Sequence, residues 1–261
     1  MEILMICELV SKAKLTANIY DFTVLSPEMA AKAVPGQFVH VLCEGGTYLR
    51  RPISIADIID KKYIRFIFEV RGKGTAALAE SKVGDELDVL GPLGNGFILS
   101  DAEPADESDD GEVVLVGGGI GIFPLLGLAK SLNGRASVLL GFRNADAVIM
   151  TDEFEPVTKN VFISTDDGSM GYHGFITDIL KNIVESNKVK AIFTCGPKPM
   201  MKIVSEIARE NDILCQVSME ERMGCGVGAC VTCTCTVKGG ERRRVCKDGP
   251  IFYGEEVEWD G

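Results

Sequence analysis

The sequence predicts a multidomain protein of the β plus α/β class: a β-barrel, an α/β domain built on a parallel sheet, and a small C-terminal module. Three features of the 261 residues lead to this prediction. Short β-like runs fill residues 1–100, strand and helix patterns alternate over 112–217, and residues 218–261 are rich in cysteine and glycine. A chain of this length has room for two domains and a small appendage.

The first region contains six short runs of strand-favouring residues. Turn signals such as Pro35-Gly36 and Gly84-Asp85 separate them, and the only helical pattern among them covers Thr75–Ser81. Strands this short and this closely spaced predict a β-barrel. The six runs read ILMICELV, NIYDFTVL, QFVHVL, PISIADII, YIRFIFEV and ELDVL.

The second region begins after an acidic stretch. Residues 101–111, DAEPADESDDG, carry no large apolar side chain, which predicts a solvated linker or surface loop. From Glu112, apolar strand runs alternate with segments of helical spacing, which predicts a parallel sheet with helices on its faces. The strand runs are VVLVG, SVLLGF, VFIST and AIFTCG, and the helical segments are FPLLGLAKSL, FITDILKNIV and PMMKIVSEIARE. In the last helix, a buried core stripe is expected at Met200, Met201, Val204, Ile207 and Ala208.

Composition narrows the classes of function. The formal charge of −11 disfavours a nucleic-acid partner. The chain has no run of about 18 uncharged apolar residues, and its first residues, MEILMICELVSKAK, lack a basic start followed by an apolar core. We therefore expect neither a membrane span nor a signal peptide. Nine cysteines then indicate thiol or metal chemistry in a reducing compartment, and we expect a cytoplasmic protein.

Four of these cysteines follow the spacing of plant-type [2Fe-2S] proteins. Cys225, Cys230 and Cys233 form C-x4-C-x2-C, and Cys246 follows after twelve more residues. The cluster with its four thiolates carries a formal charge of about −2, which the backbone N–H groups of a glycine-rich loop can stabilise. The segment is too short for a core of its own and should need a metal staple. A zinc site is the alternative, although zinc frameworks usually pair two short C-x2-C knuckles.

Two tetrapeptides in the barrel region could hold a flavin nucleotide. Arg51-Pro52-Ile53-Ser54 offers a guanidinium that can bind a pyrophosphate bidentately and a hydroxyl that could bind a flavin ring nitrogen. Gly72-Lys73-Gly74-Thr75 opens the short helical pattern, where Gly74 and Thr75 could hold phosphate through backbone amides. Each tetrapeptide alone is a weak signal, and a structural turn is the alternative.

Two loops in the α/β region could hold a dinucleotide. The segment Gly117–Pro124 lies between a strand and a helix and contains Gly118, Gly119 and Gly121, with proline where G-x-G-x-x-G has its last glycine. Cys195-Gly196-Pro197 again separates a strand from a helix. Loops at the carboxyl ends of parallel strands form the expected cleft for a nicotinamide nucleotide.

Asp166 follows the strand run VFIST and bears on the choice of nucleotide. A carboxylate at this place would repel the 2′-phosphate of NADP and could accept hydrogen bonds from a ribose hydroxyl of NAD. We therefore predict NAD specificity. The alternative is that Asp166 only begins the turn into Gly168.

In this order, the motifs R-P-I-S, G-K-G-T, G-x-G-x-x-P and C-G-P resemble the ferredoxin-NADP reductase superfamily. With the cysteine segment and Val245–Phe252, VCKDGPIF, the chain resembles the electron-transfer subunits of NAD-linked (class 1B) dihydroorotate dehydrogenases. The resemblance covers nearly the whole chain. It implies an FAD-binding barrel over 1–100, an NAD-binding α/β domain over 112–217 and a [2Fe-2S] module over 218–261.

The resemblance also implies roles for particular residues. The FAD site comprises Arg51, Pro52, Ile53, Ser54, Gly74 and Thr75, together with the backbone of Ile67, Phe68 and Glu69 along the isoalloxazine. Ile53 stands where the wider superfamily has an aromatic that packs on the flavin. Glu69 stands where related subunits often carry a basic residue. No side chain is expected to act as a catalytic residue, because the flavin and the nicotinamide carry the chemistry.

The function that the resemblance implies is electron transfer in pyrimidine biosynthesis. Electrons would pass from the FMN of a dihydroorotate dehydrogenase catalytic subunit through [2Fe-2S] and FAD to NAD⁺, in a heterotetramer of two subunits of each kind. One alternative is the reductase subunit of another complex, of the sulfide dehydrogenase or transhydrogenase type. Another is a zinc-stapled binding module without redox activity.

Three consecutive arginines, Arg242, Arg243 and Arg244, lie on a predicted hairpin strand near Cys246. They are interpreted either as a solvated edge strand protected by charge, or as a docking patch or a tuner of the cluster potential.

Overall fold

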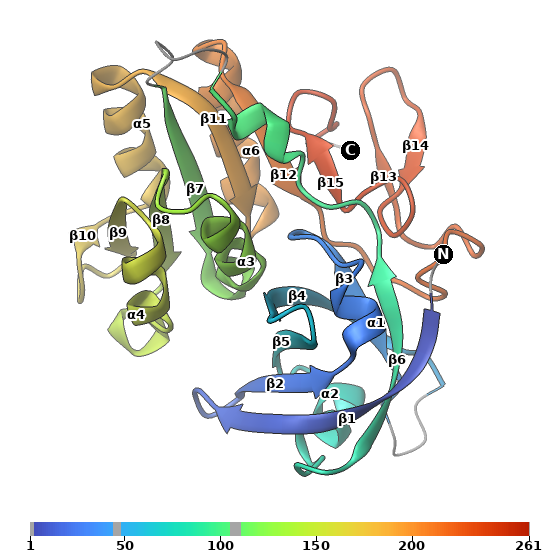
Figure 1. Cartoon of the computed structure of the whole chain (residues 1–261). Helices are drawn as coiled ribbons and strands as arrows, with labels where there is room; N and C mark the ends of the chain where they lie inside the picture. Colours follow the sequence, from blue (N-terminus) through green and yellow to red (C-terminus); the bar gives the residue numbers. More distant parts are fainter. Residues whose placement is uncertain (1–2, 44–47, 105–110, 261) are drawn as a thin grey trace. The chain divides into compact units, whose positions relative to one another are not determined.

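The computed structural model describes residues 3–43, 48–104 and 111–260 (Figure 1). The chain divides into two compact units. The first unit comprises residues 1–96, 220–235 and 242–250, and the second comprises 97–219, 236–241 and 251–261. None of the described helices is long and apolar enough to cross a membrane.

The first unit contains the predicted barrel, in which each of the six sequence runs forms one strand. The barrel is closed and antiparallel, with strand order β1-β2-β5-β4-β3-β6. Its strands are β1 (Ile3–Lys14), β2 (Ile19–Leu25), β3 (Phe38–Val41), β4 (Arg51–Ile59), β5 (Tyr63–Glu69) and β6 (Glu86–Leu93). Two short helices, α1 (Pro27–Ala30) and α2 (Lys73–Ala79), lie in its connections. The predicted β-barrel is confirmed.

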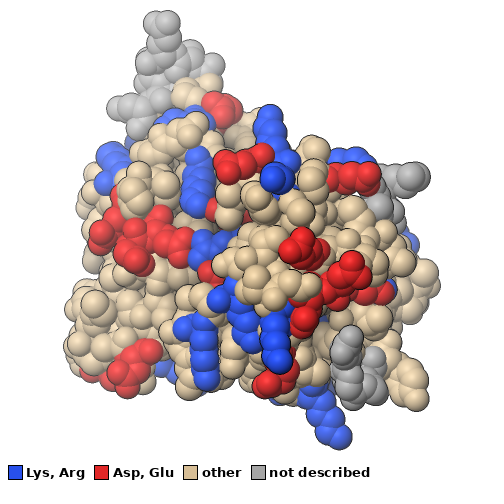
Figure 2. Space-filling view, turned by 60° about the horizontal axis from the view of Figure 1, so that its bottom comes forward, with Lys and Arg blue, Asp and Glu red and all other residues tan. Residues whose placement is uncertain are grey.

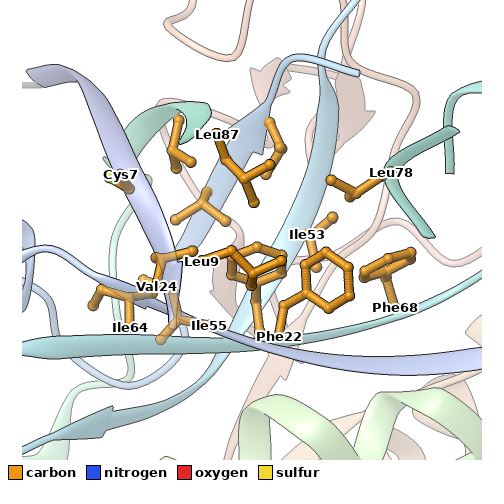
Figure 3. Packing of buried hydrophobic residues seen from close by; sticks show 14 of the residues in the cluster. Cys7, Leu9, Phe22, Val24, Ile53, Ile55, Ile64, Phe68, Leu78 and Leu87 are labelled. Carbon is orange, nitrogen blue, oxygen red and sulfur yellow. The ribbon is translucent and has the colours of Figure 1, made fainter. Parts of the chain in front are cut away.

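Aromatic side chains pack together in the barrel core (Figure 3). Phe22 and Phe68 pack edge to face with ring centroids 5.1 Å apart, and Phe66 lies 6.0 Å from Phe22. Ile53 points into the same cluster. Burial of each such side chain contributes about 1.5–3 kcal/mol to the free energy of unfolding. The period-two burial along the strands places these residues inside, because alternate side chains point to opposite faces of a strand.

The second unit is built on a seven-stranded sheet of order β10-β9-β8-β7-β11-β12-β15. All neighbours are parallel except β15, which runs antiparallel to β12. The strands are β7 (Glu112–Gly118), β8 (Ala136–Phe142), β9 (Asn160–Thr165), β10 (Tyr172–His173), β11 (Val189–Cys195), β12 (Leu214–Ser218) and β15 (Ile251–Tyr253). The predicted parallel sheet is confirmed. Buried runs such as Val113–Val116 are apolar throughout, as expected for parallel strands covered on both faces.

Helices connect these strands (Figure 1). The longer ones are α3 (Phe123–Ser131), α5 (Ile176–Ser186) and α6 (Lys198–Glu210), and α4 (Thr151–Phe154) is a single turn. Short 3₁₀ segments are η1 (Leu99–Ala102), η2 (Gly119–Ile122), η3 (Ala145–Ala147) and η4 (Glu155–Val157). Four members of the predicted stripe of α6 are buried, but Met200 is only half-buried. Its side chain meets two glycine loops rather than the helix-packing core, as described below.

The cysteine-rich segment is divided between the two units. Its cysteine-bearing parts, 220–235 and 242–250, belong to the barrel unit and contain most of the strand pair β13 (Thr234–Thr236) and β14 (Arg242–Arg244). Residues 251–261 belong to the other unit, where β15 completes the sheet. The sequence did not predict β12 or β15 as strands, because both are short and are stabilised by pairing with distant segments.

Part of the predicted acidic linker is ordered. The Gln216 side chain accepts from the Ile98 N–H at 2.9 Å and donates to Asp101 at 2.8 Å, and the Tyr253 hydroxyl donates to Asp101 at 3.0 Å. Ala102 is buried. Residues 105–110 of the predicted linker lie outside the described residues.

Candidate functional site

The four cysteines of the motif form two pairs of neighbouring thiols. Cys230 donates its backbone N–H to the Cys225 Sγ at 3.4 Å, and Cys246 donates its own to the Cys233 Sγ at 3.4 Å. The 225–233 loop joins the two thiol pairs, and four thiols in this arrangement fit a cluster of two irons.

Backbone amides of the loop point at the sulfur atoms. The N–H groups of Val227 and Ala229 donate to the Cys225 Sγ at 3.4 and 3.2 Å. The Gly228 N–H donates to the Cys246 Sγ at 3.2 Å. Such donors stabilise negative charge on sulfur, so the loop fits an anionic iron–sulfur cluster. Gly226 and Gly228 adopt positive φ values of 74° and 81°, which glycine allows without strain.

The thiols differ in how readily they lose a proton. Hydrogen bonding to Thr232, assisted by Cys225, lowers the pKa of the Cys230 thiol to about 6. Burial, with the neighbouring Cys233 thiol, raises the pKa of Cys246 to about 12. Ligation requires thiolates, so the positive charge of bound iron would have to stabilise the buried member of the set.

His40, on β3, lies against the cysteine loop from the barrel side. A Cβ atom at Gly226 would lie 2.5 Å from the His40 Nδ1, so the loop rests directly on the imidazole. Burial, and then the Arg50 guanidinium, lower the pKa of His40 to about 4, so the ring is neutral at pH 7. The sequence did not place His40 in the site, because a lone histidine in a strand run carries no spacing signal.

The two tetrapeptides of the predicted flavin site come together in the barrel unit. A Cβ atom at Gly74 would lie 2.5–2.7 Å from the guanidinium of Arg51, so the arginine head lies on the bare backbone of α2. The Thr75 hydroxyl accepts the N–H groups of Arg71 and Gly72 at 3.0 and 3.3 Å, which fixes the first turn of that helix. The arrangement presents a guanidinium beside backbone amides, a donor set suited to a pyrophosphate.

Strands β4 and β5 separate at this end of the barrel. They pair from Ile59↔Tyr63 to Ile55↔Phe66, and beyond that point β4 pairs with β3 while β5 pairs with β2. The backbones of 51–54 and 67–69 therefore flank an opening between the two strands. A flat ring system could accept hydrogen bonds from strand backbones that lack a neighbour on one side.

Three of the predicted flavin-site side chains are already engaged. The side chains of Ile53 and Phe68 belong to the barrel core, so only their backbones remain for a ligand. Glu69 accepts from Asn18 at 2.9 Å and forms an ion pair with Arg71. Ser54 and Pro52 are not fully buried, and Ile67 is buried outside the aromatic cluster.

The two loops of the predicted dinucleotide site touch each other in the second unit. Gly117 pairs with Cys195 across β7 and β11, and a Cβ atom at Gly121 would lie 2.5 Å from the Cys195 carbonyl oxygen. Gly119 adopts a φ of 54°, and nothing lies within 4 Å of the position that a Cβ atom would take there. Gly196 has a φ of 157°, and Pro197 directly precedes α6. The loops thus lie together at the carboxyl ends of adjacent strands, with Gly119 exposed.

Met200 is the residue of this region that the sequence placed incorrectly. A Cβ atom at Gly118 would lie 2.7 Å from its sulfur, and one at Gly196 would lie 2.8 Å from its methyl group. The side chain therefore covers both glycine loops from α6. Helical periodicity alone could not separate this contact from core packing, since both occupy the same face of the helix.

Asp166 lies at the same edge of the sheet, directly after β9. It is exposed, and its backbone N–H donates to the Phe142 carbonyl at 3.0 Å at the end of β8. The neighbouring Asp167 carboxylate instead accepts the N–H of Ser169 at 3.0 Å within the turn. Of the two aspartates, Asp167 shapes the turn and Asp166 faces solvent at the strand end.

Comparisons with known proteins agree with these features. Residues 220–258 match the family model of the iron-sulfur cluster binding domain of dihydroorotate dehydrogenase B, and residues 115–206 match that of the oxidoreductase NAD-binding domain. Two curated relatives are both described as "Dihydroorotate dehydrogenase B (NAD(+)), electron transfer subunit". The protein of Caldanaerobacter subterraneus subsp. tengcongensis is 38% identical over 95% of each chain. That of Geobacillus thermodenitrificans is 42% identical over 95% of this chain and 96% of its own.

A solved structure of an NADH-dependent reduced ferredoxin-NADP oxidoreductase, described in connection with flavin-based electron bifurcation, is also similar. It matches with a TM-score of 0.85 and 36% identity, over 98% of this chain and 91% of that chain. Ferredoxin-NADP⁺ reductase from Plasmodium falciparum matches with a TM-score of 0.63 and 16% identity over 79% of this chain and 89% of its own. The second likeness concerns the fold alone.

Proposed function

The chain belongs to the family of electron transfer subunits of dihydroorotate dehydrogenase B, and from that membership we propose that it transfers electrons from a catalytic partner subunit to NAD⁺. The path runs from the FMN of the partner through [2Fe-2S] and FAD. The observation that carries the proposal is the arrangement of the four thiols in two pairs, with four backbone N–H groups of the loop donating to their sulfurs, in a chain that also matches the NAD-binding domain. The proposed domain bounds are 1–100, 112–217 and 218–261, with 101–111 between the first two.

When bound, the flavin supplies the exchange between single electrons from the cluster and the two-electron hydride of the nicotinamide. The chain's own residues would bind the FAD and orient it. Arg51 binds the pyrophosphate beside the amides of Gly74 and Thr75, and Ser54 binds the ring system. The backbones of 67–69, at the opening between β4 and β5, would lie along the isoalloxazine.

The iron and nucleotide ligands are assigned in the same way. The cluster ligands are Cys225, Cys230, Cys233 and Cys246. Gly118, Gly119, Gly121, Cys195, Gly196 and Pro197 bind the dinucleotide, and Asp166 accepts from its ribose. This assignment is supported by the contact between the two glycine loops and by the exposed position of Asp166.

The partner is an FMN-containing catalytic subunit, in an assembly of two subunits of each kind. Purified chain should reduce artificial dyes with NADH and leave dihydroorotate unoxidised, because the catalytic partner subunit is the one that oxidises dihydroorotate. Mixing it with the catalytic subunit should create dihydroorotate-dependent reduction of NAD⁺, followed by absorbance at the NADH band.

A cysteine variant makes this assay specific. Cys230→Ser should abolish the coupled activity while leaving most NADH-to-dye activity, because the dye can accept electrons before the cluster. Cys235→Ser, a buried thiol outside the motif, is the matched control and should keep both activities. Oxidation of dihydroorotate by the chain alone, or full coupled activity in Cys230→Ser, would refute the proposal.

A second candidate is the reductase subunit of a transhydrogenase-type complex. The similarity to the NADH-dependent reduced ferredoxin-NADP oxidoreductase, at 36% identity, favours it. The mixing experiment distinguishes the two. Failure of the catalytic subunit to couple, together with transfer to NADP⁺ or ferredoxin in the native complex, would support this second candidate.

A further inference from the structure

One peptide group of the cysteine loop, between Gly228 and Ala229, is held at both ends. Its carbonyl oxygen accepts a hydrogen bond from the Arg244 Nη1 at 3.2 Å. Its N–H, on Ala229, donates to the Cys225 Sγ at 3.2 Å. A trans peptide group is planar, with its oxygen and hydrogen pointing in opposite directions. Fixing the oxygen therefore aims the N–H at the sulfur.

Arg244 is itself fixed by Asp248. The Arg244 Nε donates to the Asp248 Oδ2 at 3.0 Å, its Nη2 donates to Oδ1 at 3.0 Å, and its backbone N–H donates to Oδ2 at 2.8 Å. The side chains are 38% and 31% exposed, so the pair adds little to the free energy of unfolding. Because Nε and Nη2 are both bound to Asp248, the planar guanidinium has a fixed orientation, and its remaining nitrogen, Nη1, points toward the loop.

Gly228 also contacts the second thiol pair, Cys233 and Cys246. The Gly228 N–H donates to the Cys246 Sγ at 3.2 Å. A Cβ atom at Gly228 would lie 2.9 Å from the Lys247 Cβ and 3.4 Å from the Arg244 Nη1, so Arg244 packs directly against this glycine. The N–H groups of Gly228 and Ala229, on either side of the carbonyl that Arg244 binds, thus reach one sulfur of each pair.

We propose that Arg244 is a positioning residue that sets the reduction potential of the [2Fe-2S] cluster through the Gly228–Ala229 peptide, with Asp248 locking it in place. The proposal rests on the proposed function, since it requires the cluster. Adding an electron makes the cluster more negative, and N–H donors to sulfur stabilise that state. A hydrogen bond to the carbonyl also polarises the peptide and strengthens its N–H as a donor.

Two substitutions separate this role from simple charge. Arg244→Gln removes a positive charge, and Asp248→Asn removes a negative one. If only charge acted on the cluster, the first would lower the potential and the second would raise it. If the clamp positions the peptide, both should lower it, because either change releases the guanidinium from its fixed direction. Arg244→Lys, which keeps the charge and loses the fork, should also lower it.

The expected effect is a roughly tenfold smaller equilibrium constant for reduction, which is about 59 mV for a one-electron couple. Arg242→Gln is the matched control, since it removes the same charge from the same strand, where Arg242 bonds Thr234 instead. The reduction potential of Arg242→Gln should differ from that of the wild type by much less than about 59 mV. Redox titration followed by the EPR signal of the reduced cluster measures the potential, and the g-values report any change in the sulfur environment.

Opposite shifts in Arg244→Gln and Asp248→Asn, or unchanged potentials and g-values in both, would overturn the proposal. Loss of iron and sulfide from these two variants, with FAD retained and Arg242→Gln fully loaded, would support it, since the clamp then holds the ligand loop. Wild-type protein without iron and acid-labile sulfide would instead refute the proposed function. The two failures are therefore distinguishable.

Discussion

At Gly74, the absence of a side chain makes room for a charged group. A Cβ atom there would lie 2.5 Å from the Arg51 Nε and 2.7 Å from the Cζ, which no side chain could tolerate without displacing the guanidinium. At Gly72, two residues earlier, nothing lies within 4 Å of the same position. The glycines of one tetrapeptide therefore have different roles, and only Gly74 bears on where Arg51 lies.

Gly74→Ala should weaken FAD binding by about tenfold or more, because the charge-assisted hydrogen bonds of a displaced guanidinium are worth about 1.5–3 kcal/mol. The ratio of flavin absorbance to protein absorbance after dialysis measures the loss. Gly72→Ala is the matched control and should retain its flavin. Equal flavin retention in both variants would show that Arg51 does not depend on this contact.

Cys215, on β12, provides a prediction for alkaline pH. Burial raises the pKa of its thiol to about 12, with the Ser205 hydroxyl acting weakly in the opposite direction. The folded state then keeps a proton that the unfolded chain loses above about pH 8.5. Its contribution to the free energy of unfolding should be fully present below that pH and decline as the pH rises toward 12.

The midpoint temperature of thermal unfolding, measured between pH 8 and 10.5, should fall as this contribution declines. In Cys215→Ala the midpoint should depend less on pH. At pH 8, iodoacetamide should leave Cys215 unmodified in folded protein and modify it in urea, as read by mass spectrometry. Rapid alkylation of the folded protein would contradict the assignment.

The four cysteines could be picked out from the sequence because their spacing is typical of plant-type [2Fe-2S] proteins, and their role as ligands stays a prediction. The Arg244–Asp248 clamp and the position of His40 beside Gly226 depend on which segments fold against each other, and no local pattern encodes them. The prediction that Met200 lies in the buried stripe of α6 was wrong for a related reason. The same face of the helix contacts both the core and the two glycine loops.

At the scale of elements, the carboxyl edge of the sheet gathers the residues that are predicted to bind the dinucleotide. The ends of β7, β11 and β9 carry the two glycine loops and Asp166, with β8 between β7 and β9. Parallel strands bring their carboxyl ends to one edge, which is why the sequence order of these motifs could be read as one site. The strands β12 and β15 could not be predicted from the sequence, because such short strands are stabilised mainly by pairing with neighbouring strands.

Asp166→Arg should narrow the preference for NADH over NADPH, because it replaces a carboxylate that repels a 2′-phosphate with a group that binds it. The change in the ratio of kcat/KM values should be about tenfold or more, measured with an artificial dye as acceptor. Glu185→Arg, the same charge change on an exposed part of α5, is the control and should leave the ratio unaltered. Equal wild-type efficiency with both nucleotides would count against a role for Asp166.

At the scale of the whole molecule, the acidic excess does not make the surface uniformly negative. The chain has 38 acidic and 27 basic residues, yet Figure 2 shows both signs interspersed with uncharged side chains on the face it draws. The formal charge therefore indicates little about where a partner binds. It remains a reason to expect no nucleic acid.

Removal of the iron should destabilise one unit more than the other. The cysteine-bearing segments 220–235 and 242–250 belong to the barrel unit, whereas Trp259, the only tryptophan, belongs to the sheet unit. After iron removal by a chelator under reducing conditions, flavin release should occur roughly 5 °C or more earlier, while the Trp259 fluorescence transition should change little. Reconstitution with iron and sulfide should restore the first transition. An equal fall of both would indicate that the two units unfold together.

The division of the C-terminal segment has a consequence for the order of synthesis. The chain completes all six barrel strands by Leu93, but the seventh strand of the sheet, β15, consists of residues 251–253 of 261. A ribosome therefore releases the last strand of the sheet only after all four cysteines of the motif have been translated. A chain that stops at Ser218 lacks β15 together with the cysteine loop, so early termination yields two incomplete units. The complete sheet therefore requires translation through Tyr253, which pairs with Gln216 on β12.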